Sequence, residues 1–334
     1  METRIIRLLQ NIVLLSIALF VAGCSKERNS TVCELKLAHG LPTDHPVHKG
    51  IAKMADEVRR ISGGDMEIKV YPGGQLGSEQ DCIEMLQLGA LAMTKVSSAT
   101  MEGFCDDYKV LGLPYIFRNK QHVFSVLDGD IGEQILMSPQ EKELVGLCFY
   151  DAGSRSFYTR DKQVRTPDDV KGMKIRVMKS PIAVGMIKSM GGVPTPMDYG
   201  ELYTALQNGG IDGAENNPPS LYTSHHYEVC KYYTLDEHST VPDVLIISRH
   251  VWAKLSSQEQ KWLKEAAKYS VPFQRQYWKE DEEKCLNELR AAGVNVLELS
   301  DDEKKAFADI TRSNIENAKD NALLKDYIER IEAK

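Results

Sequence analysis

The sequence predicts an α/β protein built as two lobes, with one long helix that bridges both lobes. Three observations support this prediction. Strand-like and helix-like patterns alternate along most of the chain, and the length of 334 residues suits about two domains. In addition, one helical pattern is longer than a small domain is wide. We therefore expect a cleft between two α/β lobes.

The individual elements follow from side-chain periodicity and from residues that start or stop helices. Alternating polar and apolar residues predict strands at 34–37 and 66–71. Pro46 is well placed to begin a helix that Gly63 ends, and Ser78 resembles a helix cap. The same criteria predict further strands at 144–149, 173–177, near Pro194, 212–215 and 244–248, and further helices at 181–190, 200–207 and from Ser300.

The long helical pattern begins at Ser256 or Ser257 and runs nearly to Gly293, with Pro272 inside it. About 35 residues at a rise of 1.5 Å give a length on the order of 50 Å. Apolar side chains along the whole pattern favour a bridge between lobes over a protruding helix, and Pro272 allows a kink. The expected division is residues 34–152 plus 242–280 for lobe I, and 153–241 plus 281–334 for lobe II.

The N-terminus has the pattern of an export signal. Arg4 and Arg7 precede the largely apolar segment Leu8–Gly23, which is short for a spanning helix. The segment ends in VAGC, and small residues before Cys24 resemble a bacterial lipobox; the alternative is ordinary signal cleavage nearby with an incidental cysteine. We expect an extracytoplasmic protein that is lipid-anchored through Cys24, with a signal peptide at 1–23 and a tether at 24–33.

The charge of the chain excludes some classes of partner. The net charge is −7, from 41 Lys and Arg against 48 Asp and Glu. No basic field exists to attract a nucleic-acid backbone, so we expect no nucleic-acid partner. The acidic surface gives no long-range attraction for an anionic ligand either. Any anion site must therefore be built locally from a few cationic side chains.

The sequence lacks the patterns of common catalytic and metal sites. It contains no GxSxG, HExxH, Walker or GxGxxG motif. His45 and His48 form an H-x-x-H spacing without a third ligand in register, which is typical of a loop and helix start. Six cysteines after Cys24 show no metal spacing, and we expect most to be buried free thiols. We therefore expect no catalysis, no metal and no cofactor.

Three polar residues lie where α/β proteins place ligand sites, at or just past strands. Arg176 is late in the strand 173–177, Arg155 follows a loop of small residues, and Asn216 follows the strand 212–215. Taken alone, Arg176 shares a strand face with Lys174 and looks like part of an exposed edge, and Asn216 looks like a turn. Together, however, two guanidinium groups and an amide are the groups that bind a carboxylate.

The same segments resemble the substrate-binding proteins of tripartite ATP-independent periplasmic (TRAP) transporters, the DctP family. The resemblance covers roughly Leu35 to Leu299. It is carried, in family order and spacing, by YPGGQLGSE at 71–79, GMKIRV at 172–177, PTPM at 194–197, ELYTALQ at 201–207 and IDGAEN at 211–216.

The resemblance implies a periplasmic, two-lobed Venus-flytrap protein that closes on a carboxylate. It implies delivery to the small and large integral membrane subunits, with transport powered by an ion gradient. In the family, the arginine matched by Arg176 forms a bidentate pair with the ligand carboxylate, Asn216 supports it, and Arg155 is a second anchor. A planar guanidinium supplies two parallel donors, which lysine cannot do.

Several segments are similar to the hexuronate-binding members of the family. Relatives that bind sialic acid carry an acid where Ser97 falls and an amide near Gly40, so sialic acid is disfavoured. Pro218-Pro219 departs from an aromatic residue expected in uronate binders. Candidate partners for sugar hydroxyls are Glu79, Tyr199, Ser97, His39 and His238. The alternative role of Glu79 is to stabilise the helix dipole in the first turn after Ser78, and that of Tyr199 is core packing.

Three other functions remain open from sequence. The ligand of such a binding protein could be a dicarboxylate, a keto acid or an aldonate in place of a uronate. An exported enzyme acting on uronates would need an acid pair such as Glu79 and Glu237 at a workable separation. A sensor subunit that presents a ligand to a membrane receptor would use the same binding residues.

Overall fold

The computed structural model describes residues 32–334. The expected signal peptide at 1–23, the lipidation site Cys24 and most of the tether lie outside the described residues. From residue 32 to the C-terminus, no helix is long and apolar enough to cross a membrane. The following description concerns residues 34–334.

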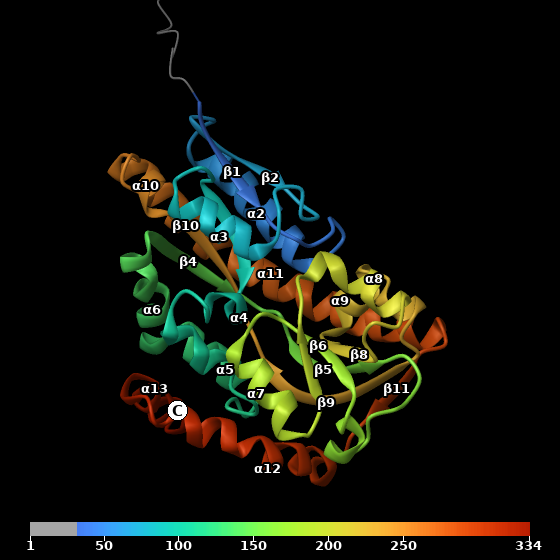
Figure 1. Ribbon diagram of the computed structural model, residues 1–334. Helices are drawn as coiled ribbons and strands as arrows, with labels where there is room; N and C mark the ends of the chain where they lie inside the picture. Colours follow the sequence, from blue (N-terminus) through green and yellow to red (C-terminus); the bar gives the residue numbers. More distant parts are fainter. Residues whose placement is uncertain (1–31) are drawn as a thin grey trace, which may run out of the picture. The chain divides into compact units, whose positions relative to one another are not determined.

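A five-stranded sheet forms the first lobe, lobe I (Figure 1). Parallel pairing joins Leu37 to Met93, whereas the strand that begins at Asp243 runs antiparallel to both of its neighbours. The strand order is β2 (Met66–Tyr71), β1 (Cys33–Ala38), β3 (Met93–Ser97), β10 (Asp243–Ser248) and β4 (Leu144–Tyr150). The helices of this lobe are α2 (Pro46–Ile61), α3 (Glu79–Gln87), α4 (Ser98–Met101), α5 (Lys120–Leu127), α6 (Asp130–Met137), α10 (Arg249–Trp252) and α13 (Ala322–Glu332).

A six-stranded sheet forms the second lobe, lobe II. Its strand that begins at Ser154 runs antiparallel to both neighbours, so that Ser156 pairs with Asn216. The strand order is β11 (Asn295–Glu298), β9 (Tyr232–Thr240), β5 (Ser154–Thr159), β8 (Gly213–Asn216), β6 (Lys174–Val177) and β7 (Val193–Pro196). The helices of this lobe are α7 (Pro181–Ser189), α8 (Leu202–Gln207), α9 (Pro218–Thr223) and α12 (Asp301–Ala318).

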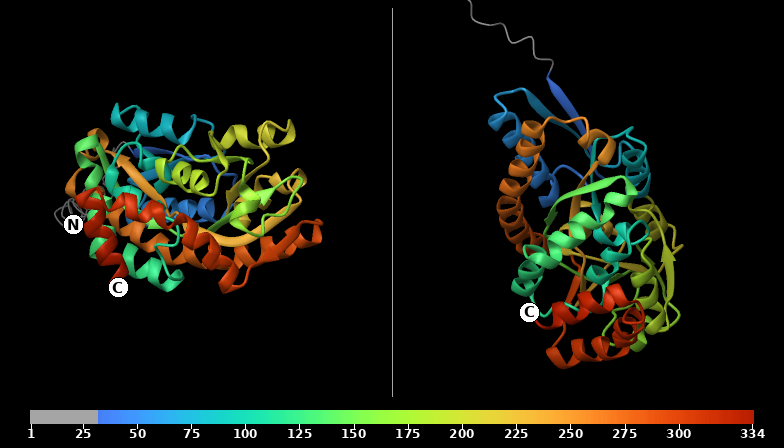
Figure 2. Two further views of the ribbon diagram at one scale, coloured as in Figure 1. Left: turned by 60° about the horizontal axis from the view of Figure 1, so that its bottom comes forward. Right: turned by 90° about the vertical axis from the view of Figure 1, so that its left-hand side faces the viewer.

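Helix α11 (Ser257–Ala291) bridges the two lobes, as the sequence predicts. Ser256 and Glu259 form a capping box at its start, and Pro272 lies inside it. The helix packs on α2 and β4 of lobe I and on α9 and β11 of lobe II. It is the orange helix in the right-hand view of Figure 2. The two-lobed α/β prediction with a bridging helix is therefore confirmed.

The chain crosses between the sheets at two further places, from β4 to β5 and from β9 to β10. At the first crossing, the Gln274 amide of α11 accepts a hydrogen bond from the Asp151 N–H and donates one to the Asp151 carbonyl, both at 2.8 Å. Gly153 has φ +58°, and a Cβ there would lie 2.8 Å from Trp278 Nε1. Only glycine fits this approach of the crossing to α11 without displacement.

The C-terminal helix departs from the expected division into lobes. Residues 281–334 were expected in lobe II, and α12 does pack on α7 and β9. However, Leu324, Tyr327, Ile328 and Ile331 of α13 are buried in the core of lobe I, and α13 lies beside α6 (Figures 1 and 2). The chain therefore returns to lobe I at its end, and the remaining boundaries stay predictions.

Five of the cysteines are buried free thiols. They are Cys82, Cys105, Cys148, Cys230 and Cys285. Burial raises the pKa of each thiol, for example of Cys82 and Cys105 to about 11. These side chains are therefore protonated, unreactive packing groups, as the sequence predicts for most of the cysteines.

Candidate ligand-binding site

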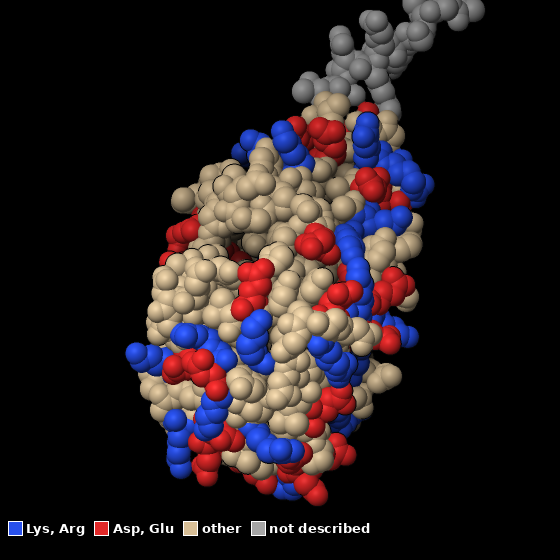
Figure 3. Space-filling view, turned by 90° about the vertical axis from the view of Figure 1, so that its right-hand side faces the viewer, with Lys and Arg blue, Asp and Glu red and all other residues tan. Residues whose placement is uncertain are grey.

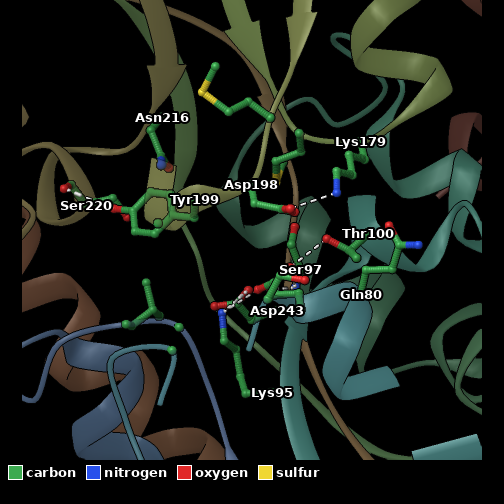
Figure 4. Close-up of a pocket in the computed structure, with 18 of the residues that line it drawn as sticks. Gln80, Lys95, Ser97, Thr100, Lys179, Asp198, Tyr199, Asn216, Ser220 and Asp243 are labelled. Atoms are coloured by element: carbon green, nitrogen blue, oxygen red, sulfur yellow. Dashed lines mark hydrogen bonds and ion pairs between the residues drawn. The ribbon is translucent and has the colours of Figure 1, made fainter. Parts of the chain in front are cut away.

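A cavity of about 410 Å³ lies between the two lobes. Residues of lobe I form one wall and residues of lobe II form the other (Figure 4). Six of the eight predicted ligand-binding residues line it: Arg176, Asn216, Arg155, Glu79, Tyr199 and Ser97. The size suits a small-molecule ligand.

Arg176 lies at the centre of the lobe II wall. Strand β6 is internal, between β8 and β7, and the side chain is 2% exposed, so the exposed-edge interpretation from periodicity is wrong. Nε and Nη2 donate to the carbonyl of Met197, at 3.0 and 2.8 Å. Nη1 is buried and has no hydrogen-bond partner in residues 32–334. Burial of this unmatched cation lowers the pKa of Arg176, although the group stays charged.

Arg155, on the same wall, is held by its own carboxylate. The antiparallel register of β5 and β8 places it beside Glu215, whose carboxylate accepts from Nε and, at 2.9 Å, from Nη2. Nη1 donates to Asn216 Oδ1 at 3.0 Å. Burial opposes the charge of Arg155, but Glu215 outweighs it and the pKa is raised. Arg155 is thus a charge-compensated arginine, in contrast to Arg176.

His238 lies behind Arg155 and does not line the cavity. Its Nδ1 is 2.7 Å from Asp236 Oδ2, and its Nε2 is 3.4 Å from Glu215 Oε2. Burial lowers the pKa of His238, but the two carboxylates outweigh burial and raise it to about 9. For Glu215, burial raises the pKa, yet Arg155 and His238 bring it down to about 2. Arg155, Glu215, His238 and Asp236 therefore form a row of four buried charges of alternating sign.

An amide and a phenol complete the lobe II wall. Asn216 Oδ1 accepts from Arg155 Nη1 and from the Asn217 N–H at 2.9 Å, which leaves the amide Nδ2 of Asn216 to donate into the cavity. The Tyr199 hydroxyl is 2.7 Å from Ser224 Oγ, and its ring centroid is 5.8 Å from the Arg176 guanidinium carbon. Tyr199 and Asn216 lie on the same side of the cavity in Figure 4.

On the lobe I wall, Glu79 occupies the first turn of α3. Its carboxylate accepts from the Ser97 N–H at 3.1 Å, from Thr100 Oγ1 at 2.6 Å and from Lys95 Nζ at 3.2 Å. The Ser97 hydroxyl accepts from the Ala99 N–H at the start of α4. Both predicted residues therefore line the cavity, but the carboxylate of Glu79 already holds three protein donors.

Lys95 and Asp243 belong to this wall and were not predicted from sequence. Lys95 is 3% exposed, and its Nζ is 3.2 Å from Asp243 Oδ1 (Figure 4). Burial raises the pKa of Asp243 to about 6, against the opposing effect of Lys95. Asp243 is the first residue of β10, which runs antiparallel to β3. Asp243 therefore pairs with Ser97, the last residue of β3. The strand pattern predicts ligand contacts only for residues that follow the carboxyl ends of strands. Asp243 lies at the amino end of an antiparallel strand, which reaches the same edge of the sheet.

His39 is buried but does not line the cavity. Its Nδ1 accepts from the Leu41 N–H at 3.2 Å, and its Nε2 is 3.0 Å from His48 Nδ1. Burial, with the charge of Lys95, lowers its pKa to about 3. The nearby His45 lines the cavity instead, with Nε2 3.2 Å from Ser220 Oγ. No cluster of three metal-ligating side chains occurs within residues 32–334.

A buried carboxyl joins the two lobes outside the cavity. Glu102 follows α4 of lobe I and accepts from the Ser180 hydroxyl at 2.7 Å and from the Ile182 N–H at 3.3 Å, at the start of α7 in lobe II. Burial raises the pKa of Glu102 to about 8. Its other oxygen, Oε1, is buried without a hydrogen-bond partner in the described chain. No pattern in the sequence indicates this contact.

The comparisons with known proteins agree with this geometry. The model of "Bacterial extracellular solute-binding protein, family 7" (DctP) matches residues 37–321. A TRAP periplasmic solute-binding protein from Xanthobacter autotrophicus Py2, solved with β-D-galacturonate, is 42% identical with a TM-score of 0.86, covering 90% of this chain and 99% of its own. One from Pseudomonas putida F1, solved with D-glucuronate, is 38% identical with a TM-score of 0.86, covering 90% and 97%.

A curated relative gives the same assignment. A solute-binding protein of Chromohalobacter salexigens is 40% identical over 266 residues, which are 80% of this chain and 79% of the relative. The TRAP-family resemblance and the solute-binding function predicted from sequence are therefore confirmed. This chain belongs to the DctP family of bacterial extracellular solute-binding proteins and is a TRAP-type solute-binding protein.

Proposed function

We propose that this protein binds a hexuronate, D-galacturonate or D-glucuronate, and delivers it to the membrane subunits of a TRAP transporter. The ligand carboxylate pairs with Arg176. One observation carries the proposal: Arg176 lines the cavity, and its Nη1 is a buried cationic donor without a partner in residues 32–334. A buried cation without a counter-charge is costly, so an anion that enters the cavity satisfies it.

The rest of the lobe II wall supports the same orientation of the ligand. Asn216 has Nδ2 left to donate to a ligand, and Arg155, whose charge Glu215 matches, holds Asn216 Oδ1. Tyr199 covers the guanidinium of Arg176 with its ring. As the lobes close and exclude water, the ion pair strengthens because the local dielectric falls. Two solved relatives bind uronates, which supports the choice of ligand class.

Binding without turnover is the better-supported activity. An enzyme acting on uronates needs two carboxyl groups that flank the substrate. Glu79 lines the cavity, but Glu237 does not, and Glu237 pairs with Lys304 at the surface. The acid pair considered from sequence is therefore not assembled at this cavity.

The cellular placement of the protein is part of the proposal. We infer export by the signal peptide 1–23, a lipid anchor on Cys24 and a tether at 24–33, which holds the protein at the membrane outside the cytoplasm. Positive and negative side chains are interspersed on the face shown in Figure 3. That face thus provides no single-sign field, and ligand capture relies on the local charges of the cavity.

Calorimetric titration of residues 25–334 tests the proposal. D-glucuronate is compared with D-glucose, which differs only at the carboxyl-bearing carbon, and D-galacturonate is titrated in parallel. We expect 1:1 binding of at least one uronate at micromolar or tighter affinity, and no heat with glucose. Conversion of either uronate, followed by NMR, would argue for an enzyme. Silence for both uronates would discard the ligand assignment.

A further inference from the structure

We propose that Lys95 and Asp243 form a hydroxyl-recognising subsite opposite Arg176, and that this subsite excludes ligands with a second carboxylate. The inference rests on the proposed function, because it describes the other end of the same cavity. It narrows the ligand class to acids with one carboxylate and neighbouring hydroxyls. It also moves the main hydroxyl contact from Glu79 to Asp243.

The hydrogen bonds on the lobe I wall determine which groups remain for a ligand. Both oxygens of Glu79 are engaged, by the Ser97 N–H, Thr100 Oγ1 and Lys95 Nζ. Asp243 uses Oδ1 for Lys95, and its Oδ2 has no hydrogen-bond partner in the part of the chain that the structure describes. Asp243 lines the cavity, so Oδ2 is the acceptor that a ligand can use.

Lys95 supplies the matching donor. Its ammonium group has three N–H bonds, and two are directed to Glu79 and Asp243, each at 3.2 Å. The third has no hydrogen-bond partner within the described residues 32–334, and Lys95 lines the same cavity as Asp243. An adjacent donor and acceptor suit two neighbouring hydroxyls, one donating to Asp243 and the next accepting from Lys95.

The charge of this subsite opposes a second carboxylate. Two carboxylates, Glu79 and Asp243, surround one ammonium, which leaves a local net charge of about −1. The opposite wall holds the unmatched cation Arg176. A ligand with one carboxylate fits this arrangement. A dicarboxylate held by Arg176 would place its second negative charge against two acids, which costs binding energy.

Two comparisons test the inference. D-galactonate and galactarate differ only in that one terminal CH2OH is a carboxylate, so their affinity ratio measures tolerance of the second charge. D-galacturonate is titrated into wild type, Asp243→Asn and Glu79→Gln. Asp161→Asn is the matched control, since Asp161 is 85% exposed and lies outside the cavity. Circular dichroism and melting temperature confirm that each variant is folded.

We expect wild type to bind galactarate at least about tenfold more weakly than galactonate. Asp243→Asn should lower galacturonate affinity at least about tenfold, because a charged hydrogen bond is lost. Glu79→Gln should lower it less, and both variants should bind galactarate more tightly relative to galactonate. The control should match wild type.

The outcomes separate this inference from the proposed function. Wild type that binds no sugar acid overturns both. Wild type that binds galacturonate, with full affinity retained in Asp243→Asn or equal affinity for galactonate and galactarate, overturns the subsite alone. If the Asp243 variant fails to fold, Glu79→Gln is used, because it removes the other acid of the subsite. A ratio of galactonate to galactarate affinity equal to that of wild type in this variant overturns the subsite. If wild type binds neither galactonate nor galactarate, the test is the galacturonate affinity of the variants. Affinity equal to wild type in Asp243→Asn then overturns the subsite.

Discussion

The two walls of the inter-lobe cavity balance charge in different ways. On the lobe II wall, Arg155 is matched by Glu215, whereas Arg176 has only the carbonyl of Met197. On the lobe I wall, the single positive charge of Lys95 is paired with two carboxylates, those of Glu79 and Asp243. The buried cation Arg176 of one wall therefore lacks an acidic partner in residues 32–334, and two acids of the other wall share the single cation Lys95.

This difference explains how an acidic protein selects an anion. The net charge of −7 gives no attraction at long range, so selection depends on the side chains that line the cavity. The two arginines show that burial of a guanidinium group is not enough to identify a ligand-binding role. Arg155 has a structural partner, whereas Arg176 Nη1 has none in residues 32–334, and for this reason we propose Arg176 as the ligand contact.

The largest expected effect comes from removing Glu215, the acidic partner of Arg155. Glu215→Gln leaves Arg155 and His238 as buried cations, with Asp236 as the remaining acid of the network. We expect a loss of about 3–5 kcal/mol in the free energy of unfolding, because a buried pair is broken from one side. Urea unfolding followed by circular dichroism measures it. A loss under about 1 kcal/mol would mean that Arg155 is not held by this carboxylate.

Replacing Arg176 tests the unmatched arginine directly. Arg176→Gln should cost about 2–5 kcal/mol of uronate binding energy, since the carboxylate loses its charged partner. The same variant should not lose stability, because it removes an uncompensated buried cation. Arg176→Lys is the matched variant that keeps the charge but loses the planar fork, and it should bind weakly. Uronate affinity equal to wild type in Arg176→Gln, measured by calorimetry, would contradict the clamp.

The network behind Arg155 also predicts how stability depends on pH. The pKa of His238 is raised to about 9 in the folded protein, above its ordinary value of 6.5. This group therefore stabilises the fold fully below pH 6.5, and the contribution is lost as the pH rises through 9. Melting temperatures should fall between pH 6.5 and 9, and His238→Gln should flatten that fall. An equally steep fall in the variant would assign the effect to other groups.

The contact between the lobes gives the smallest effect. Burial raises the pKa of Glu102 to about 8 from an ordinary 4.5, so its contribution to stability is present below pH 4.5 and lost as the pH rises through 8. Glu102→Gln is neutral but can still accept from Ser180 and Ile182. We expect the variant to gain stability over wild type at pH 9 relative to pH 5, because only wild type carries a carboxyl that ionises more readily in the unfolded state. A constant difference across this range would contradict a buried, titrating carboxyl.

The sequence predicted the main architecture because periodicity and capping report local structure. The bridging helix has a capping box and apolar residues along its length, and it was found almost to the residue. Strand β3 was missed because all five of its residues, including Lys95, are buried and no alternation marks it. The return of α13 to lobe I depends on tertiary packing, which no local pattern records.

The site was only partly accessible from sequence. Periodicity predicts an exposed edge for Arg176, and only the resemblance to a known family predicts that it contacts the ligand. His238 and His39 are polar residues of suitable type, but neither lines the cavity. Asp243 was missed because β10 runs antiparallel to both neighbours. Its first residue therefore lies beside the last residues of β3 and β4, at the same edge of the sheet. Strand direction is set by long-range pairing and cannot be inferred from the residues of one strand.

A crystal structure of the protein with bound D-galacturonate would test the central claim most directly. We expect the carboxylate within hydrogen-bond distance of Arg176 Nη1 and Asn216 Nδ2, with sugar hydroxyls on Asp243 Oδ2 and Lys95 Nζ. A ligand in the reverse orientation, with its carboxylate on the lobe I wall, would contradict the account, as would a carboxylate held elsewhere while Arg176 stays unpaired.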